Sequence, residues 1–289
     1  MKNTIEYILF LGLSYFAGLI GLNLTRKFSL FIAVLFYYFI PIRKKTVFEN
    51  LTNAFPEYSK KRIKKIAFGS YRSFSIALVE ILYMPFMNKE KMGKMVECGN
   101  SDLIIKRYNE NCGVILLSAH FGNWEYVAAS VGIRVGIPFK VVVKPQRNPF
   151  VTKWMNKVRT KWGNEVVSLG ISIRQIYKEL KEKNIVAMVA DQRGPAEGLR
   201  VTFFGRKIAI YPGPAIMSLK TNAPIIYGIN IRQPGYNYKT HLYEIDKANL
   251  PEDEEEKIIE LSQRHTTYLE KIIRENPEQW LWMHKLWKY

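Results

Sequence analysis

The chain has few cysteines and lacks the signature motifs of several large enzyme classes. Its 289 residues include only two cysteines, Cys98 and Cys112, which excludes a disulfide-stapled fold and favours a reducing compartment. The sequence contains no GxSxG nucleophile elbow, Walker-type phosphate loop, HExxH zinc motif or CxxC pair. An intrinsically disordered chain is also excluded, because 48% of the residues are hydrophobic and can bury a core.

Acidic residues are scarce relative to basic ones. The 25 Asp and Glu residues are outnumbered by 43 Lys and Arg residues, which gives a formal net charge of +18 at pH 7. Such an excess predicts an anionic partner, which can be nucleic acid, an anionic membrane surface or a phosphorylated substrate. Neither an internal repeat nor a long low-complexity linker interrupts the chain, which suits one α/β domain with an appendage.

Two uncharged segments dominate the first 42 residues. The run from Tyr7 to Thr25 has roughly the length that crosses a bilayer core as a helix. The run from Phe28 to Ile42 is shorter, and it predicts an interfacial or re-entrant helix that stops at Pro41. We therefore interpret residues 1–45 as a retained membrane anchor, with a signal peptide or a buried core helix as the alternatives.

The flanks of these apolar segments are basic. Five cations lie close to them: Arg26, Lys27, Arg43, Lys44 and Lys45. By the positive-inside tendency, these residues and the chain that follows are predicted to lie on the cytoplasmic side. The run Ser59–Lys65 adds five more cations, which next to an anchor favours contact with anionic lipid over an ordinary solvated helix face.

The pattern beyond the anchor predicts an α/β domain over residues 46–289, with a mostly parallel sheet flanked by helices. Residues 46 to about 95 are expected to be helical, and from about residue 96 short apolar runs alternate with amphipathic segments. Strands are expected at Gly113–Ala119, Phe139–Val143, Glu165–Ser168, Ile185–Ala190, Arg200–Phe204 and Ile225–Asn230. Helices are expected near 123–132, 150–162, 171–183 and 213–221, and a final helix over about Glu252–Glu275.

The segment Gly113 to Val127 carries the clearest chemical signal. His120 follows an apolar run that suits a buried strand, and open α/β sheets place active-site groups at such strand ends. Gly122 and Asn123 permit a tight turn and a helix cap, so that Glu125 falls in the first helical turn. We expect Glu125 to hold one ring nitrogen of His120, while the nearby helix N-terminus keeps the ring neutral and ready to act as a base.

A histidine base without a protein nucleophile suits a reaction in which the substrate supplies the attacking group. The base removes a proton from a bound hydroxyl, and the oxygen attacks an activated acyl carbon. From the spacing alone, a histidine that merely caps a helix explains the pattern as well.

The segment HFGNWE resembles the HxxxxD/E box of glycerolipid-type acyltransferases, in the HFxxWE form of the bacterial lipid A biosynthesis (lauroyl/myristoyl) acyltransferase family. Further segments are similar to that family's blocks in the same order: the apolar N-terminus with its basic helix, KPQRNPFVTKWMNKVRTKWG, ADQRGPAEGLRVTFFGRKIAIYPGPAIMSLKTNAPII and PEQWLWMHKLWK. The resemblance covers nearly the whole chain. It departs from the family at Lys144 and Pro145, where members often carry an Arg-Pro pair.

The resemblance implies acyl transfer from a thioester of acyl-carrier protein or coenzyme A to a hydroxyl of a phosphorylated membrane glycolipid, late in lipid A biosynthesis. It implies no cofactor, because the thioester is already activated, and no nucleic-acid partner. It places the catalytic domain on the cytoplasmic face of a bacterial inner membrane. Two other readings are open: acylation of another lipid, such as a phosphoinositide mannoside or an amino-acid lipid, and a non-catalytic membrane protein that binds anionic lipid.

The resemblance also suggests roles for individual residues. His120 would be the general base and Glu125 its orienting partner. Arg159 would meet phosphate or a developing oxyanion, and Asp191 would orient Arg159 or a substrate hydroxyl. Without a functional role, Arg159 would be a surface cation and Asp191 would cap the turn at the end of a strand.

Other candidates have weaker support. Arg147 is a further phosphate candidate that can equally be a solvated surface residue, and Asn123 is a substrate-binding candidate. The tryptophans near the C-terminus fit either the core or an interfacial anchor: Trp280, Trp282 and Trp287. His284 is expected to be a surface or packing residue without a catalytic role.

Overall fold

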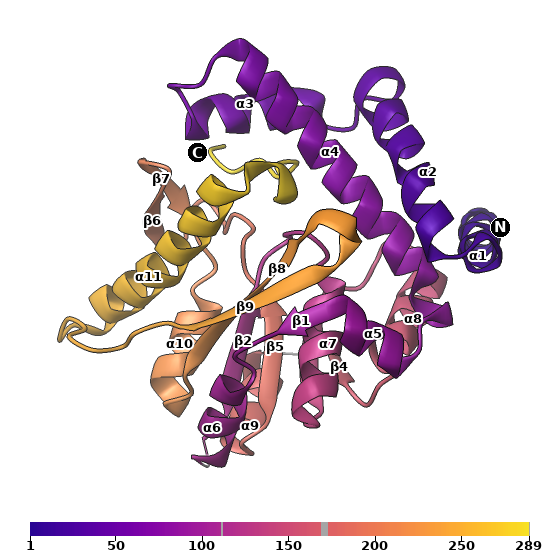
Figure 1. The fold of residues 1–289 in the computed structure, drawn as a ribbon. Coiled ribbons are helices and arrows are strands. Elements are labelled where there is room, and N and C mark those ends of the chain that lie inside the picture. Colours follow the sequence, from indigo (N-terminus) through magenta and orange to yellow (C-terminus); the bar gives the residue numbers. More distant parts are fainter. Residues whose placement is uncertain (111, 169–172, 289) are drawn as a thin grey trace.

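The computed structural model describes residues 1–110, 112–168 and 173–288. Its centre is a seven-stranded sheet in the order β1-β9-β8-β2-β5-β3-β4 (Figure 1). The pairs from β8 to β4 are parallel, whereas β9 runs antiparallel to β8 and carries β1 parallel to itself. The prediction of a mostly parallel sheet flanked by helices is confirmed.

The strands of this sheet are β1 (Val96–Cys98), β2 (Val114–Ser118), β3 (Phe139–Val143), β4 (Glu165–Ser168), β5 (Ile185–Val189), β8 (Ile225–Arg232) and β9 (Tyr238–Glu244). A separate antiparallel hairpin consists of β6 (Arg200–Phe203) and β7 (Arg206–Ala209). Every predicted strand is present within two residues of its expected bounds. The predictions miss β1, β7 and β9, which are short or carry many polar residues and depend on pairing with a neighbour.

Helices cover both faces of the sheet. The side chains of β2 alternate between them: Ile115 and Leu117 belong to the same core cluster as the helices α9 to α11, and Leu116 faces α6 and α7. Burial on both faces explains why β2 is a continuous apolar run. The helices after β1 are α6 (Asp102–Asn109), α7 (Glu125–Val135), α8 (Pro149–Arg159), α9 (Ile173–Lys181), α10 (Gly213–Thr221) and α11 (Glu254–Glu275). All five predicted helices of this region are confirmed, although residues 171 and 172 of one prediction lie outside the described residues.

The N-terminal apolar region forms two helices, which divide the uncharged run Tyr7–Thr25 at Gly21. Helix α1 (Lys2–Ile20) ends at Gly21, whose φ of 78° is readily adopted only by glycine, and α2 (Leu22–Val34) starts directly after it. A π-helical turn (Leu35–Phe39) follows, and α3 (Lys44–Ala54) leaves at 92° to this segment. In length and composition alone, this bent pair is similar to a broken membrane span or a re-entrant loop.

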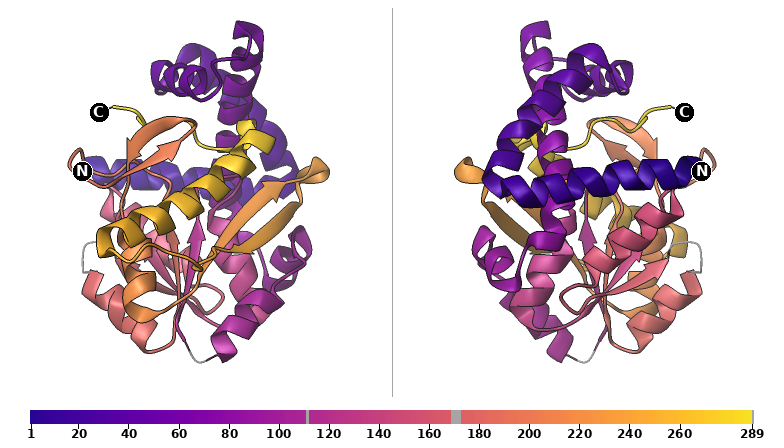
Figure 2. Two further views of the ribbon diagram at one scale, coloured as in Figure 1. Left: turned by 90° about the vertical axis from the view of Figure 1, so that its left-hand side faces the viewer. Right: turned by 90° about the vertical axis from the view of Figure 1, so that its right-hand side faces the viewer.

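Helix α1 lies across one side of the domain, in contact with α4 (Lys60–Tyr83) and α8 (Figure 2). It is the one helix among the described residues that is long and apolar enough to cross a membrane on its own, and only 11% of its most apolar window is buried. Large apolar side chains on it are exposed: Ile5, Ile8, Leu9, Leu13, Phe16 and Leu19. This helix is therefore a candidate membrane anchor.

The region predicted to be helical after residue 46 contains α3, α4 and α5 (Lys89–Met95). The side-chain hydroxyl of Ser59 caps the start of α4 by accepting a hydrogen bond from the backbone N–H of Arg62 at 3.3 Å. Behind this cap, the five cations of the run Ser59–Lys65 are all exposed. Further along α4, Ile63, Ile66 and Tyr71 are buried, as their helical spacing predicts.

Candidate active site

Two neighbouring strands bring His120 and Asp191 together. In the parallel strands β2 and β5, the last residues Ser118 and Val189 lie opposite each other. His120 and Asp191 each come two residues after the end of their strand, so they lie at the same edge of the sheet. Oδ1 of Asp191 lies 2.7 Å from Nδ1 of His120, and its Oδ2 accepts the backbone N–H of His120 at 2.8 Å. An ionised carboxylate can only accept, so Nδ1 carries the proton and Nε2 of the neutral ring has a free lone pair.

Glu125 does not hold the imidazole ring, contrary to the prediction. It starts α7 and accepts two hydrogen bonds from Arg159 at the end of α8, from Nε at 2.8 Å and from Nη2 at 2.6 Å. The reason is that α7 and α8 pack in one hydrophobic cluster, which brings the start of one helix beside the end of the other. Arg159 is thus held by Glu125. Asp191 does not orient it, although this was one of the two roles expected for Asp191.

The charges around the ring raise the pKa of His120. Burial alone would lower it, but the charge and hydrogen bond of Asp191, together with the charge of Glu125, outweigh burial. The two carboxylates therefore act on the pKa of the ring in the direction opposite to that expected of a helix N-terminus. Burial alone would raise the pKa of Asp191. Contact with His120 and Trp280 nevertheless holds the pKa of this carboxyl below its usual value.

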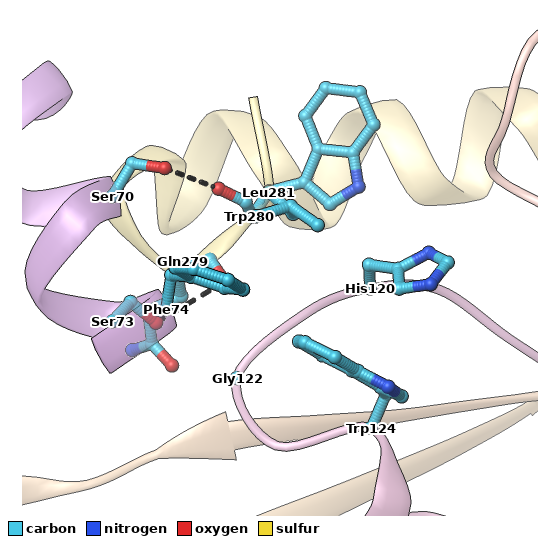
Figure 3. A pocket seen from close by; sticks show the side chains of 9 residues that line it. All are labelled: Ser70, Ser73, Phe74, His120, Gly122, Trp124, Gln279, Trp280 and Leu281. Carbon is cyan, nitrogen blue, oxygen red and sulfur yellow. Dashed lines mark hydrogen bonds between the residues drawn. The ribbon is translucent and has the colours of Figure 1, made fainter. Parts of the chain in front are cut away.

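The C-terminal segment completes the surroundings of His120 (Figure 3). Trp280 donates its indole N–H to Oδ2 of Asp191 at 2.9 Å, and the backbone N–H of Leu281 donates to the carbonyl of His120 at 3.0 Å. The Trp124 ring lies on the other side, with its centroid 5.0 Å from that of His120. Trp280 and Trp282 are buried, which decides for the core over an interfacial anchor at these two positions, and Trp287 is partly buried.

His284 also lies at this site, which the sequence analysis missed. Its ring centroid is 5.5 Å from that of His120, and its Nε2 is 3.2 Å from Nε2 of Gln192. Burial lowers the pKa of His284 to about 4, so its ring is neutral near pH 7. Only the block WLWMHKLWK pointed to this segment, and nothing in the spacing connects it to His120.

Two predicted substrate-binding residues lie apart from this cluster. Asn123 is fully buried, and its Nδ2 donates to Oε2 of Glu80 at 2.9 Å instead of capping α7 or facing an opening. The cause is the tight turn at Gly122, where φ is 54° and a Cβ would lie 2.2 Å from a backbone oxygen of Asn230. Arg147 is exposed in the loop between β3 and α8.

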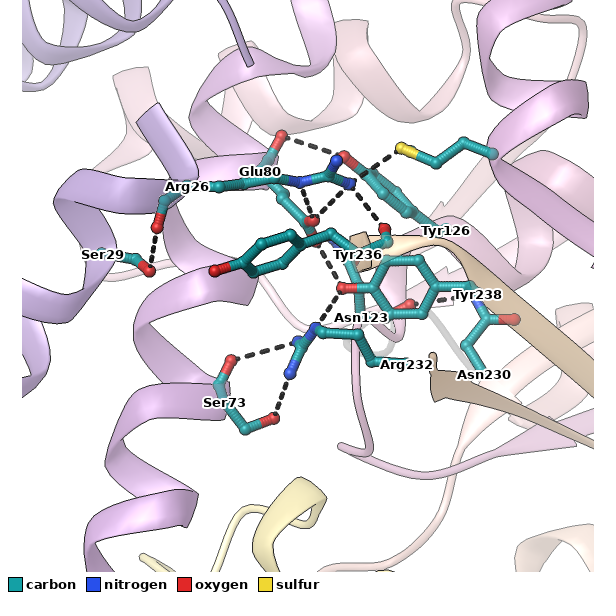
Figure 4. Close-up of polar contacts among 11 residues, drawn as sticks. Arg26, Ser29, Ser73, Glu80, Asn123, Tyr126, Asn230, Arg232, Tyr236 and Tyr238 are labelled. Carbon is teal, nitrogen blue, oxygen red and sulfur yellow. Dashed lines mark hydrogen bonds and ion pairs between the residues drawn. The ribbon is translucent and has the colours of Figure 1, made fainter. Parts of the chain in front are cut away.

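A buried polar network lies behind this turn (Figure 4). Glu80 of α4 has no exposed side-chain surface, and it accepts hydrogen bonds from Nε of Arg26 at 2.7 Å and from the hydroxyl of Tyr238 at 2.6 Å. Arg26 was predicted to be a basic membrane flank, but it is only 4% exposed and links α2 to the domain. In the sequence, Arg26 lies between two apolar runs, and nothing there indicates that it pairs with the buried carboxylate of Glu80.

The arrangement can perform base chemistry. His120 is oriented through Nδ1 and is 19% exposed at its side chain, and the gap that it lines with Trp124 and Trp280 is too narrow for a water molecule. Within the described ranges, no three His, Cys, Asp or Glu side chains gather as metal ligands.

Comparison with known proteins agrees with this architecture. A family model described as bacterial lipid A biosynthesis acyltransferase matches residues 1–289. The chain is similar to the lipid A biosynthesis palmitoleoyltransferase and the lipid A biosynthesis lauroyltransferase of Escherichia coli (strain K12), each at 23% identity over 86% of this chain and 80% of the relative. It is also 23% identical to the phosphatidylinositol mannoside acyltransferase of Mycolicibacterium smegmatis, over 54% of this chain and 53% of that protein.

Proposed function

Since this chain belongs to the bacterial lipid A biosynthesis acyltransferase family, we propose that it moves a fatty acyl chain from an acyl thioester to a hydroxyl of a phosphorylated membrane glycolipid, in a late acylation of lipid A biosynthesis. The observation that carries the proposal is the hydrogen bond between His120 and Asp191 at the ends of two parallel strands. It supplies an oriented base in a chain that lacks the signature motifs of the usual protein nucleophiles.

In the proposed reaction, Nε2 of His120 removes the proton from the acceptor hydroxyl. The hydroxyl oxygen attacks the thioester carbonyl carbon and forms a tetrahedral oxyanion, which collapses when the C–S bond breaks. The departing thiolate takes the proton from the imidazolium, so that ester and thiol are formed and His120 returns to the neutral state. Asp191 stabilises the imidazolium between these two proton transfers, as in other histidine–carboxylate pairs.

Glu125 and Arg159 act on the base as a pair in this proposal. Their side chains are only 10% and 12% exposed, and the bidentate contact fixes both groups. Glu125 adds negative charge that favours the imidazolium, and Arg159 holds this carboxylate in place. Arg159 is then a positioning residue, because its guanidinium is already engaged.

Membrane attachment is part of the same proposal. Residues 1–45 would anchor the domain of residues 46–289 to the cytoplasmic face of the inner membrane, where a soluble thioester donor and a lipid acceptor meet. The exposed apolar surface of α1 and the exposed cations at the start of α4 support this arrangement. The donor would be an acyl-carrier protein or coenzyme A thioester, and an acidic carrier protein would suit the net charge of +18.

A second candidate acceptor is a phosphoinositide mannoside. It is favoured by the similarity to the mycobacterial phosphatidylinositol mannoside acyltransferases, which covers just over half of this chain. Both acceptors are phosphorylated glycolipids that offer a hydroxyl, so the proposed chemistry is the same for both.

Mass spectrometry of the lipids in a deletion strain tests the proposed function. Without the protein, a lipid A species lighter by one fatty-acyl group should accumulate, and its mass difference identifies the transferred chain. The gene with His120→Ala should not restore the full-mass lipid, whereas the gene with His241→Ala should, because His241 is an exposed residue of β9. A lighter phosphoinositide mannoside would instead support the second candidate, and an unchanged lipid profile would contradict both.

A further inference from the structure

A hollow of about 480 Å³ lies next to His284 and to the two residues that follow Asp191. It is lined by Arg43, Gln192, Arg193, His284 and Lys285. Its volume falls within the range of about 300–1,000 Å³ that small-molecule sites occupy. The ring centroids of His284, in its wall, and His120 are 5.5 Å apart, so His284 is a neighbour of both the hollow and the base.

The described lining of this hollow combines three cations with two neutral hydrogen-bonding side chains. The guanidinium of Arg43 donates to the backbone carbonyl of Met283 at 3.1 Å, which is a neutral acceptor. His284 is neutral near pH 7, because burial lowers its pKa to about 4, and it contacts the amide of Gln192. Such a lining suits an oxyanion that carries further polar groups, such as a sugar phosphate.

Two of the three segments that build the hollow also position the base. Gln192 and Arg193 directly follow Asp191, and His284 and Lys285 belong to the C-terminal segment whose Trp280 contacts Asp191. The third segment is the end of the apolar N-terminal region, where Arg43 has a left-handed φ of 52°. This conformation is unfavourable for a residue with a Cβ, and such strain concentrates at functional sites.

Exposed apolar side chains lie close to Arg43 of the hollow in the sequence. Phe39 and Ile40, just before Arg43, are 75% and 55% exposed. A lipid whose chains contact this apolar surface would have its headgroup at the level of Arg43. Arg159, which was expected from the sequence to meet phosphate, is engaged by Glu125.

We propose that the hollow lined by Arg43, Gln192, Arg193, His284 and Lys285 binds a phosphate ester of a substrate and holds it beside His120. The proposal rests on the acyl-transfer function proposed above. The phosphate can come from the glycolipid acceptor or from the phosphopantetheine arm of the donor, and both sources present the same oxyanion.

A direct binding experiment tests the hollow without relying on acyl transfer. Inorganic pyrophosphate is titrated against the full-length protein in detergent, and binding is followed by ³¹P line broadening. The double variant Arg193→Gln/Lys285→Gln should weaken binding about tenfold or more, since it removes two charge-assisted contacts. The control Lys178→Gln/Lys220→Gln, which removes two charges from exposed positions on α9 and α10, should bind like the wild type. Absent broadening in the wild type, or equal binding by the double variant, would overturn the proposal.

Steady-state kinetics then identify the source of the phosphate. If the acceptor binds here, the double variant should raise the KM for the phosphorylated acceptor about tenfold or more, with little change in kcat or in the KM for a dephosphorylated acceptor. A rise in the KM for the thioester donor alone would assign the hollow to the donor. Unchanged KM values for both substrates would overturn the hollow as a substrate site. A wild-type protein that transfers no acyl chain contradicts the proposed function instead, and the pyrophosphate titration still decides on the hollow.

Discussion

At the residue scale, two carboxylates act on His120 in different ways. Asp191 contacts the ring directly and also accepts the indole N–H of Trp280, so its orientation is fixed from two sides. Glu125 acts only through its charge, because both of its oxygens accept from Arg159. The result is an imidazole with a pKa above the ordinary value of 6.5, which makes it a stronger base but leaves it protonated over a wider pH range.

This difference predicts how the activity depends on pH. The acid limb of kcat/KM should have its midpoint above 6.5, because activity is lost as the pH falls through the raised pKa of His120. Asp191→Asn should move this midpoint to lower pH and Glu125→Gln should move it less, since the contact with Asp191 has the larger effect on the pKa. The pH profiles of the three proteins provide the test. A limb that does not move in Asp191→Asn would contradict the assignment of the titrating group.

Part of this site was predictable from the sequence. His120 at a strand end followed from an apolar run and a glycine turn, which are local signals. The partner of its ring was not predictable from spacing: Glu125 is near in sequence, but Asp191 is near in space because β2 and β5 are neighbours in register. His284 and Trp280 join the site only through the return of the C-terminal segment to the sheet, which no local pattern encodes.

At the scale of secondary-structure elements, a buried ion pair fastens the N-terminal helices to the domain. Arg26 of α2 and Glu80 of α4 are almost completely buried, and Glu80 also accepts from Asn123 in the turn after His120. The strands of the sheet follow from apolar runs and turn residues. The buried polar network could not be predicted in this way. Its members come from four distant parts of the chain, and each resembles an ordinary surface residue in the sequence.

Removing one member of the pair should destabilise the protein. Glu80→Gln leaves the Arg26 guanidinium buried without a counter-charge, and breaking such a pair costs about 3–5 kcal/mol. Thermal and urea unfolding of the full-length protein in detergent measure the loss. Glu90→Gln is the matched control, because Glu90 forms an exposed ion pair with Lys94 and should change stability little. Equal effects of the two substitutions would show that the Arg26–Glu80 pair does not fasten α2.

At the scale of the whole molecule, exposed apolar and exposed basic surfaces lie along α4: the apolar helix α1 packs near its C-terminal end, and the cations lie at its start. The exposed apolar side chains of α1 and the cations of Ser59–Lys65 at the start of α4 are both features of proteins that bind anionic membranes. The domain behind them has the two-sided core of an ordinary α/β fold. An apolar run of this length predicted an anchor from the sequence, but the break at Gly21 was hidden because glycine is tolerated in apolar helices.

Polar substitutions on α1 should weaken membrane binding without unfolding the domain. Leu9, Leu13 and Phe16 are each at least 50% exposed, so Leu9→Ser/Leu13→Ser/Phe16→Ser removes apolar surface that packs against little in the protein. Each such side chain contributes about 1.5–3 kcal/mol when it leaves water. Flotation with anionic vesicles should show a large loss of bound protein, while Ile173→Ser/Tyr243→Ser, at exposed apolar positions elsewhere, should bind normally. Unchanged flotation of the triple variant would count against α1 as an anchor.

The most direct test of the account is acyl transfer by the purified full-length protein. With a radiolabelled acyl thioester and an underacylated lipid A precursor, the wild type should form the ester. His120→Ala should lower the rate by about 10²–10⁴-fold, the usual contribution of a general base, while it still binds vesicles. The control His241→Ala should retain the wild-type rate. Transfer that survives in His120→Ala would contradict the central claim that this imidazole activates the acceptor hydroxyl.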